Sequence, residues 1–162
     1  MKLWRQQRLL YLIIAALVVS GAVFYFLQGS LHDSPVLEIR GTVSREIYGE
    51  WPMEEGEEFA IEFIHSVNQS PVRETFVIEE NMIRLHSVRF YSVGAGIPDH
   101  LEEGWEMSRD GEAMLITGFN TSFRELNLIV GTVSDHLLLL RGENISLRDL
   151  CGRNAHITMR VR

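Results

Sequence analysis

Three residues with side chains suited to chemistry, His65, Glu74 and Ser87, fall in three successive segments with the alternating pattern of β-strands. Residues opposite each other in an antiparallel pair share a face of the sheet, so pairing these segments would bring the three into one row. Arg89 follows one step beyond Ser87. The expected row offers an imidazole, a carboxylate, a hydroxyl and a guanidinium.

The order of this row decides which chemistry it could carry. A hydrolytic triad needs the histidine between the serine and the acid, because the imidazole must accept the hydroxyl proton. Here Glu74 is expected in the middle, which favours a network in which it accepts hydrogen bonds from His65 and Ser87. Three roles stay open: a polar network that closes the end of the core, a site that binds a ligand or partner, or an envelope hydrolase that uses these three residues.

The register behind this row comes from matching apolar side chains. Pairing Ile61 with Ile78 aligns the apolar faces of two neighbouring segments and, four residues on, sets His65 opposite Glu74. The same matching predicts three further pairs: Phe63 with Phe76, Phe76 with Leu85, and Ile78 with Ile83. The third segment should contain a β-bulge, because Val88 and its apolar neighbour at position 90 fall on the wrong face without one.

The segment Gly94-Ala95-Gly96-Ile97-Pro98 has little side-chain bulk. Two glycines separated by one residue, with a proline soon after, specify a tight backbone path. The segment is either an ordinary turn at a strand end or a loop that lets a ligand or another backbone come close. We therefore add four residues to the candidate binding site: Ser66, Gly94, Gly96 and Pro98.

Residue types that bind metals occur without a recognised ligand spacing. The candidates are His65, His86, Asp99, His100 and Glu102. The sequence also contains no Walker-type phosphate loop and no Gly-x-Ser-x-Gly elbow. We therefore expect no metal ion and no organic cofactor.

Short runs rich in Val, Ile, Phe and Thr, separated by turn residues at intervals of roughly 8–12 positions, make up residues 36–162. This spacing is typical of an all-β fold, either an antiparallel β-sandwich or a partly open barrel. We expect strands, with eleven as an upper bound, at residues 36–40, 42–48, 58–67, 72–79, 83–91, 105–109, 113–119, 123–130, 136–141, 145–147 and 155–161.

Residues 9–27 form an uncharged, mostly apolar run, and a helix of that length spans about 28 Å, enough to cross a bilayer. Basic residues precede the run and none follows it closely, which keeps the N-terminus in the cytoplasm. We expect residues 1–28 to be a cytoplasmic stub and single-pass transmembrane anchor, 29–35 a tether, and 36–162 an extracytoplasmic β domain. A cleaved signal peptide is the alternative, and it would leave the domain exported and soluble.

The charge of the domain bears on which classes of molecule it can bind, and its cysteine content bears on how an exported domain could be stabilised. The chain has 15 Lys plus Arg and 22 Asp plus Glu, and from residue 31 onward the counts are 12 and 22, a net charge of −10. An acidic domain argues against nucleic acid, which requires clustered basic residues. The single Cys151 forbids an internal disulfide, so an exported domain must be stabilised by its core alone.

Two motifs, in order along the chain, resemble a known family. The first is Phe63-Ile64-His65-Ser66-Val67, continued by Pro71-Val72, Glu74 and Phe76, and the second runs from Phe90 to Pro98. With these motifs the chain resembles, over about residues 36–130, the bacterial family named domain of unknown function 1850. Two positions depart from the family pattern: Ile97 stands where leucine is expected, and Val93 where an aromatic residue is frequent.

This resemblance implies a setting and a partner, but no catalytic residue. Members are small exported or anchored proteins, often encoded beside tripartite (TRAP) transporters of the TAXI type. The resemblance thus implies a bacterial cell envelope, with the anchor in the inner membrane and the domain in the periplasm. The family has no established catalytic residues, so none transfers to this chain. The resemblance implies an accessory or interaction role with the membrane subunit or the solute-binding subunit of such a transporter. A ligand-binding module that acts alone is the other non-enzymatic alternative.

Overall fold

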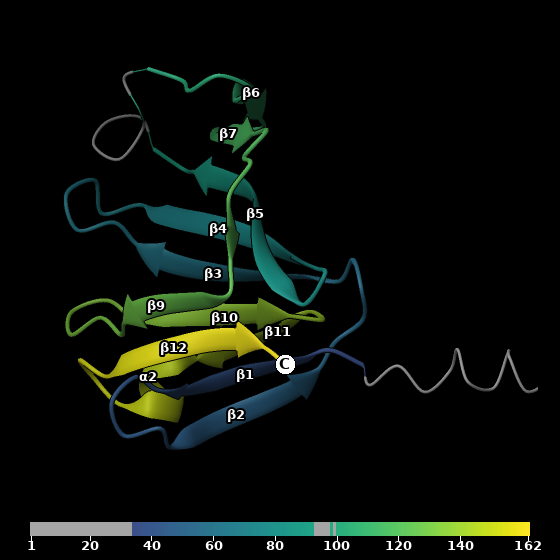
Figure 1. Ribbon diagram of the computed structural model, residues 1–162. Helices are drawn as coiled ribbons and strands as arrows, with labels where there is room; N and C mark the ends of the chain where they lie inside the picture. Colours follow the sequence, from purple (N-terminus) through teal and green to yellow (C-terminus); the bar gives the residue numbers. More distant parts are fainter. Residues whose placement is uncertain (1–33, 93–97, 99) are drawn as a thin grey trace, which may run out of the picture. The chain divides into compact units, whose positions relative to one another are not determined.

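The computed structural model describes residues 34–92, 98 and 100–162, which form two antiparallel β-sheets (Figure 1). The expected membrane segment at residues 9–27 lies outside the described residues. Among the helices of the described part, none is long and apolar enough to span a bilayer. The sequence prediction of an all-antiparallel β fold is confirmed for the domain itself.

The smaller sheet has four strands in the order β2-β1-β12-β9. Their bounds are β1 Val36–Gly41, β2 Ile47–Pro52, β9 Glu125–Ile129 and β12 His156–Val161. The first and last strands of the domain lie side by side, with Leu37 opposite Val161. This pairing joins two segments that are far apart in the sequence.

The larger sheet follows the order β11-β10-β3-β4-β5-β7-β6, and β8 pairs with β5 beside that path. The bounds are β3 Glu58–Ile64, β4 Pro71–Glu79, β5 Met82–Phe90, β6 Glu106–Asp110, β7 Ala113–Thr117, β8 Ser122–Phe123, β10 His136–Leu140 and β11 Glu143–Ser146. Strands β6 and β7 lie at the end of the domain farthest from β2 (Figure 1). That end of the larger sheet is therefore remote from the smaller sheet.

The main core lies between the two sheets. The smaller sheet contributes Leu37, Ile39, Ile157, Met159 and Val161, and the larger sheet contributes Phe59, Ile61, Phe76, Ile78, Ile83, Leu138 and Leu140. The rings of Phe59 and Phe76 stack with centroids 5.3 Å apart. Burying such aromatic and aliphatic side chains is the main source of stability in a domain without disulfides.

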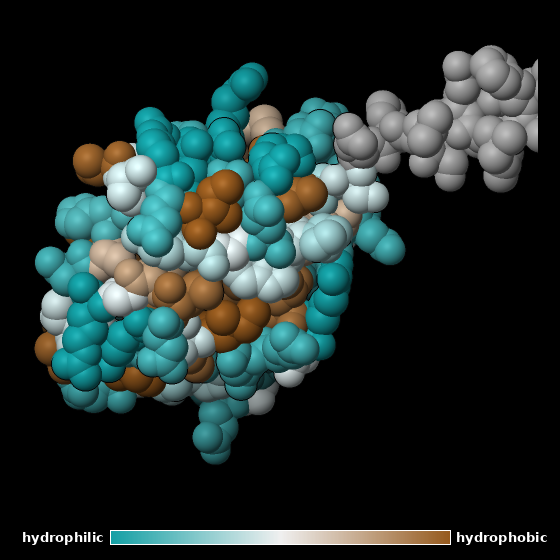
Figure 2. All heavy atoms as spheres, turned by 90° about the horizontal axis from the view of Figure 1, so that it is seen from below, coloured by the Kyte–Doolittle hydropathy of each residue, from teal (hydrophilic) through white to brown (hydrophobic). Residues whose placement is uncertain are grey.

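A second, smaller cluster continues the same face of the larger sheet toward β7. Its buried members are Val72, Val88, Phe90, Ile116 and Phe119. These five residues are between 1 and 8 % exposed, so the second cluster is part of the interior. The face of the domain that is seen from below carries several hydrophobic patches among hydrophilic and intermediate residues (Figure 2).

The predicted pairing of His65 with Glu74 is wrong by four residues. Strand β3 pairs with β4 so that Ile61 lies opposite Glu74 and Phe59 opposite Phe76, and β3 ends before His65. Because side chains alternate with a period of two, a slip of four keeps every residue on its predicted face. The apolar pattern therefore identified the faces correctly but could not select the register.

The predicted pairing of β4 with β5 is correct near the turn and requires the predicted bulge. Ile78 lies opposite Ile83 and Phe76 opposite Leu85, after which the register shifts between Thr75 and Phe76. Beyond the shift Thr75 lies opposite Ser87. The bulge was therefore predicted correctly, but its position turns Ser87 away from Glu74.

Two other expectations about the elements need correction. The strand expected at residues 42–48 is instead a turn followed by the start of β2. In this turn Arg45 has a φ of 61°, and its N–H donates to the carbonyl of Gly41. A short helix, α2 (Leu147–Cys151), follows β11 and was not predicted; the Ser146 hydroxyl caps it by accepting from the Asp149 N–H. The structure describes twelve strands, one above the expected upper bound.

Candidate functional site

A cavity of about 280 Å³ opens on the second cluster. It is lined by Phe63, His65, Val72, Glu74, Val88, Phe90, Pro98, Trp105, Ile116 and Phe119. Residues of the strands β3, β4, β5 and β7 form its floor, and Pro98, Trp105 and Phe119 contribute its walls. The site is thus the part of the interior face that lies toward β7.

Glu74 interrupts an otherwise apolar row that crosses six strands. The row reads Leu138, Ile61, Glu74, Val88, Ile116 and Met107. Its position follows from alternation along β4, where Val72 and Phe76 on either side also point to the interior face. A carboxyl group at this position faces apolar neighbours from both adjoining strands.

Among the described residues that line the cavity, none other than His65 is a basic residue that could balance the charge of the Glu74 carboxyl group. Within the described part of the chain no hydrogen bond or ion pair reaches it. Burial raises the pKa of this carboxyl group above its ordinary value, because the charged form loses hydration without compensation. Such a group favours any partner that offers a positive charge or a hydrogen-bond donor.

His65 follows directly after β3 and is held by the turn that joins β3 to β4. Its backbone N–H donates to the carbonyl of Ser70 at 2.9 Å, and its own carbonyl accepts from the N–H of Gln69. The ring nitrogen Nδ1 accepts from the N–H of Val67 at 3.3 Å. In the neutral imidazole the other nitrogen, Nε2, then carries the proton and is a donor.

One wall of the cavity is aromatic and depends on a glycine contact. The rings of Trp105 and Phe119 meet edge to face, with centroids 4.6 Å apart. The residues before them, Gly104 and Gly118, approach so closely that a Cβ on Gly118 would lie 2.0 Å from the Gly104 carbonyl oxygen. Gly118 also has a φ of 83°, a conformation that glycine adopts without strain. The close approach brings the two rings together.

Only part of the predicted row reaches this site. His65, Glu74 and Pro98 line the same cavity, although the register expected for the first two is wrong. Ser87 and Arg89 do not, because the bulge places them opposite Thr75 and Arg73, on the other face of β4. Arg89 forms an ion pair with Asp110. The triad of His65, Glu74 and Ser87 is therefore not assembled.

The remaining candidates are placed as follows. Ser66 lies in the exposed turn after His65 and is not among the residues that line the cavity. Gly94 and Gly96 lie outside the described residues. The prediction missed Trp105 and Phe119, although the pairs Gly104-Trp105 and Gly118-Phe119 repeat a glycine before an aromatic residue and could have suggested them.

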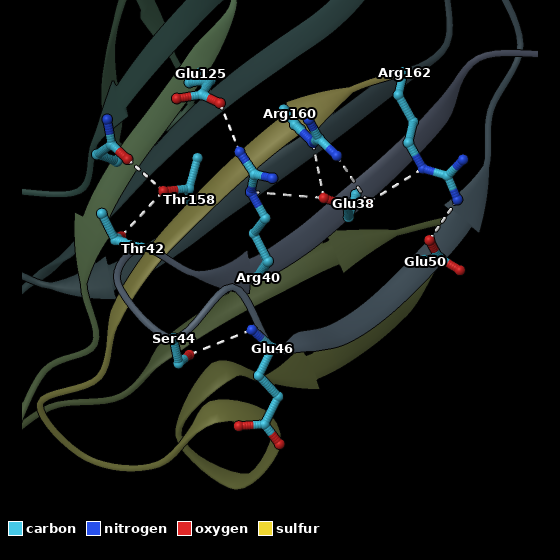
Figure 3. Close-up of polar contacts among 11 residues, drawn as sticks. Glu38, Arg40, Thr42, Ser44, Glu46, Glu50, Glu125, Thr158, Arg160 and Arg162 are labelled. Atoms are coloured by element: carbon cyan, nitrogen blue, oxygen red, sulfur yellow. Dashed lines mark hydrogen bonds and ion pairs between the residues drawn. The ribbon is translucent and has the colours of Figure 1, made fainter.

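The other conspicuous polar cluster lies on the smaller sheet and is internally neutralised (Figure 3). Glu38 is only 2 % exposed, and it accepts from Arg160 at 2.8 Å and lies 3.2 Å from Arg162. The hydrogen bond from Arg160 contributes most to lowering the pKa of Glu38 below its ordinary value. Arg162 and Arg40 also contact other acids, Glu50 and Glu125. Each of these arginines and glutamates forms an ion pair within the cluster. The cluster therefore connects neighbouring strands and leaves none of these charges free to bind a ligand.

Comparison with known proteins places the cavity within a described family. No curated protein and no solved structure matches the chain. The family model described as domain of unknown function (DUF1850) matches residues 59–147, more than half of the chain. Every residue that lines the cavity falls within that match. The protein therefore belongs to the DUF1850 family.

Proposed function

We propose that the domain of residues 34–162 binds a small, largely apolar ligand in the cavity beside Glu74. The observation that carries this proposal is the cavity itself, whose walls are aliphatic and aromatic except for His65 and Glu74. Ligand sites in proteins usually have this composition: mostly apolar walls and a few polar groups that fix orientation. Its volume of about 280 Å³ suits a ligand of one ring or a short chain.

Two other roles have less support. A hydrolase that uses Ser87 lacks its nucleophile, because Ser87 lies on the other face of β4 and β5. In a polar network that only closes the end of the core, the polar side chains would form hydrogen bonds with one another. Within the described residues, however, Glu74 forms no hydrogen bond with His65. A carboxylate left open toward a cavity supports binding over mere closure of the core.

The test uses a neutral aromatic probe, 2-(4-fluorophenyl)ethanol, and fluorine NMR of the full-length chain in a mild detergent. We expect the probe signal to broaden and shift with wild-type protein and not with Val88→Phe, which fills the cavity from its floor. Val43→Phe adds the same side chain at a turn position that is 89 % exposed, and it should bind like the wild type. Equal signals for all three proteins would show that the probe sits in the detergent or on the surface, and the proposal would be wrong.

We also propose that this binding takes place outside the cytoplasm, in a domain anchored to the inner membrane beside a TRAP-type transporter. The apolar run at residues 9–27 supports the anchor, and the resemblance to proteins often encoded beside such transporters supports the transporter setting. Either the membrane subunit or the solute-binding subunit is the expected partner.

A set of exposed apolar residues near the end of β3, which we call the apolar rim, supports a protein contact there. We define it as Ile64, Val67, Tyr91 and Val133, which are all exposed, the two valines by 70 % and 95 %. Hydrogen bonds hold three parts of the rim together: Ser134 donates to the Ile64 carbonyl, and the Tyr91 N–H donates to Pro71 beside the end of β3. Exposed apolar groups gathered at one place often mark an interaction site.

Co-purification from membranes tests this second part. Transporter subunits should accompany the wild-type chain in mild detergent and be lost with the double change Val67→Asp and Val133→Asp. Val43→Asp, which alters an equally exposed valine in the β1–β2 turn, is the matched control and should retain them. If no subunit accompanies the wild-type chain, or the rim variant retains the subunits, the transporter proposal fails while ligand binding stays a separate question.

A further inference from the structure

The charges around the cavity select among apolar ligands. Of the described residues that line it, only Glu74 and His65 are ionisable, and none is lysine or arginine. An organic acid would therefore bring a second negative charge next to Glu74 with no guanidinium or ammonium group to receive it. Like charges in a partly buried site repel each other, and the cost is greater than in water.

We infer that the cavity takes a small apolar amine in its cationic form, with the ammonium group on Glu74 and the apolar part against the aromatic wall. This inference rests on the proposed ligand-binding function. The carboxylate lacks a partner among the described residues, and a ligand cation would supply both the counter-charge and the hydrogen-bond donors.

The aromatic residues add a second reason for a cation. Phe63, Phe90, Trp105 and Phe119 all contribute to the lining, and the negative face of an aromatic ring attracts an ammonium group. The edge-to-face arrangement of Trp105 and Phe119 presents these rings in different orientations. Apolar rings can thus hold the carbon skeleton of the ligand and also tolerate its charge.

The charge of the whole domain acts in the same direction. From residue 31 onward the chain has a net charge of −10, which raises the local concentration of cations and lowers that of anions. The ring of His65 uses its Nδ1 to accept a hydrogen bond from the Val67 N–H. Its Nε2–H can still donate to an acceptor atom on the ligand.

The experiment compares three probes of similar shape: 2-(4-fluorophenyl)ethylamine, 2-(4-fluorophenyl)ethanol and 4-fluorophenylacetate. We expect the amine to bind the full-length chain most tightly, the alcohol more weakly and the acid weakest. Glu74→Gln should weaken amine binding by roughly 10- to 100-fold, the size expected for losing a charge-assisted hydrogen bond, and change alcohol binding little. Glu143→Gln removes an exposed carboxylate from β11 and should leave all three affinities unchanged.

The outcomes separate this inference from the proposed function. If the alcohol and the amine bind equally, or Glu74→Gln leaves the amine affinity unchanged, the cavity binds ligands but does not select cations, and the inference is overturned. Tightest binding of the acid would overturn it as well. If none of the probes binds, ligand binding itself is refuted. Thermal unfolding of Glu74→Gln shows whether the variant is folded, and Val88→Phe, which keeps Glu74 but fills the cavity, should lose all three probes.

Discussion

Replacing Glu74 with leucine should stabilise the fold at neutral pH, in contrast to most changes at interior positions. The carboxyl group faces Ile61 and Val88 across the sheet and has no partner among the described residues. An uncompensated polar group in such surroundings costs about 1–3 kcal/mol in proteins. Leucine removes that cost and adds apolar surface to the row, so we expect the free energy of unfolding to rise by about 1–3 kcal/mol at pH 7.

The pH dependence gives this prediction its sharper form. Because burial raises the folded-state pKa of Glu74, the destabilisation is absent below the unfolded-state pKa and grows as the pH rises through the folded-state value. The advantage of leucine over the wild type should therefore shrink between pH 7 and pH 4. Urea unfolding of the full-length chain in a mild detergent, followed by tryptophan fluorescence, measures it at both values.

Two results would contradict this reasoning. A loss of stability in Glu74→Leu at pH 7 would mean that the carboxylate forms a stabilising contact. A gain that does not depend on pH would mean that ionisation of Glu74 costs nothing in the folded state. Glu143→Leu, at an exposed position of β11, is the control and should change the free energy of unfolding by less than about 0.5 kcal/mol.

Three further predictions follow from the packing. Glu38→Gln should lower the free energy of unfolding by about 1–3 kcal/mol, because it weakens the charge-assisted bond from Arg160. Since the folded-state pKa of Glu38 is lowered, this contribution exists above the unfolded-state pKa and is lost as the pH falls through the folded-state value. Urea unfolding should therefore show that the difference in free energy of unfolding between the wild type and Glu38→Gln disappears in acid. A difference that stays constant with pH would refute this prediction. Gly118→Ala should separate Trp105 from its aromatic neighbour, and an unchanged fluorescence spectrum and unchanged probe binding would contradict the close approach at this glycine. Phe76→Ala should cost about 3–5 kcal/mol by leaving a void between the sheets, and a loss below about 1 kcal/mol in thermal or urea unfolding would show that the core is not packed as described.

The expected partner of the cavity also predicts its behaviour with pH. Affinity for the amine probe should fall on acidification, because protonation of Glu74 removes the counter-charge. Binding of the alcohol probe should change much less. A titration of both probes between pH 7 and pH 4 measures this, and parallel losses for the two would point to unfolding of the site.

The sequence by itself determined the fold class and the face on which each side chain lies. Alternation has a period of two, so Ile61, Glu74 and Phe76 were correctly assigned to one shared face from their spacing alone. The sequence also predicted the bulge between β4 and β5, because the apolar residues of β5 change from one alternating set of positions to the other along the strand.

Only the tertiary structure decided which of these residues meet. Registers that differ by four residues present the same faces, so the apolar pattern cannot distinguish the pairing of Phe63 with Phe76 from the observed pairing of Phe59 with Phe76, in which β3 ends before His65. The cavity needs residues from distant segments, such as Trp105 and Phe119, which are brought together by the close contact of two glycines. A contact of this kind depends on where the backbones lie in space, and no local propensity encodes that distance.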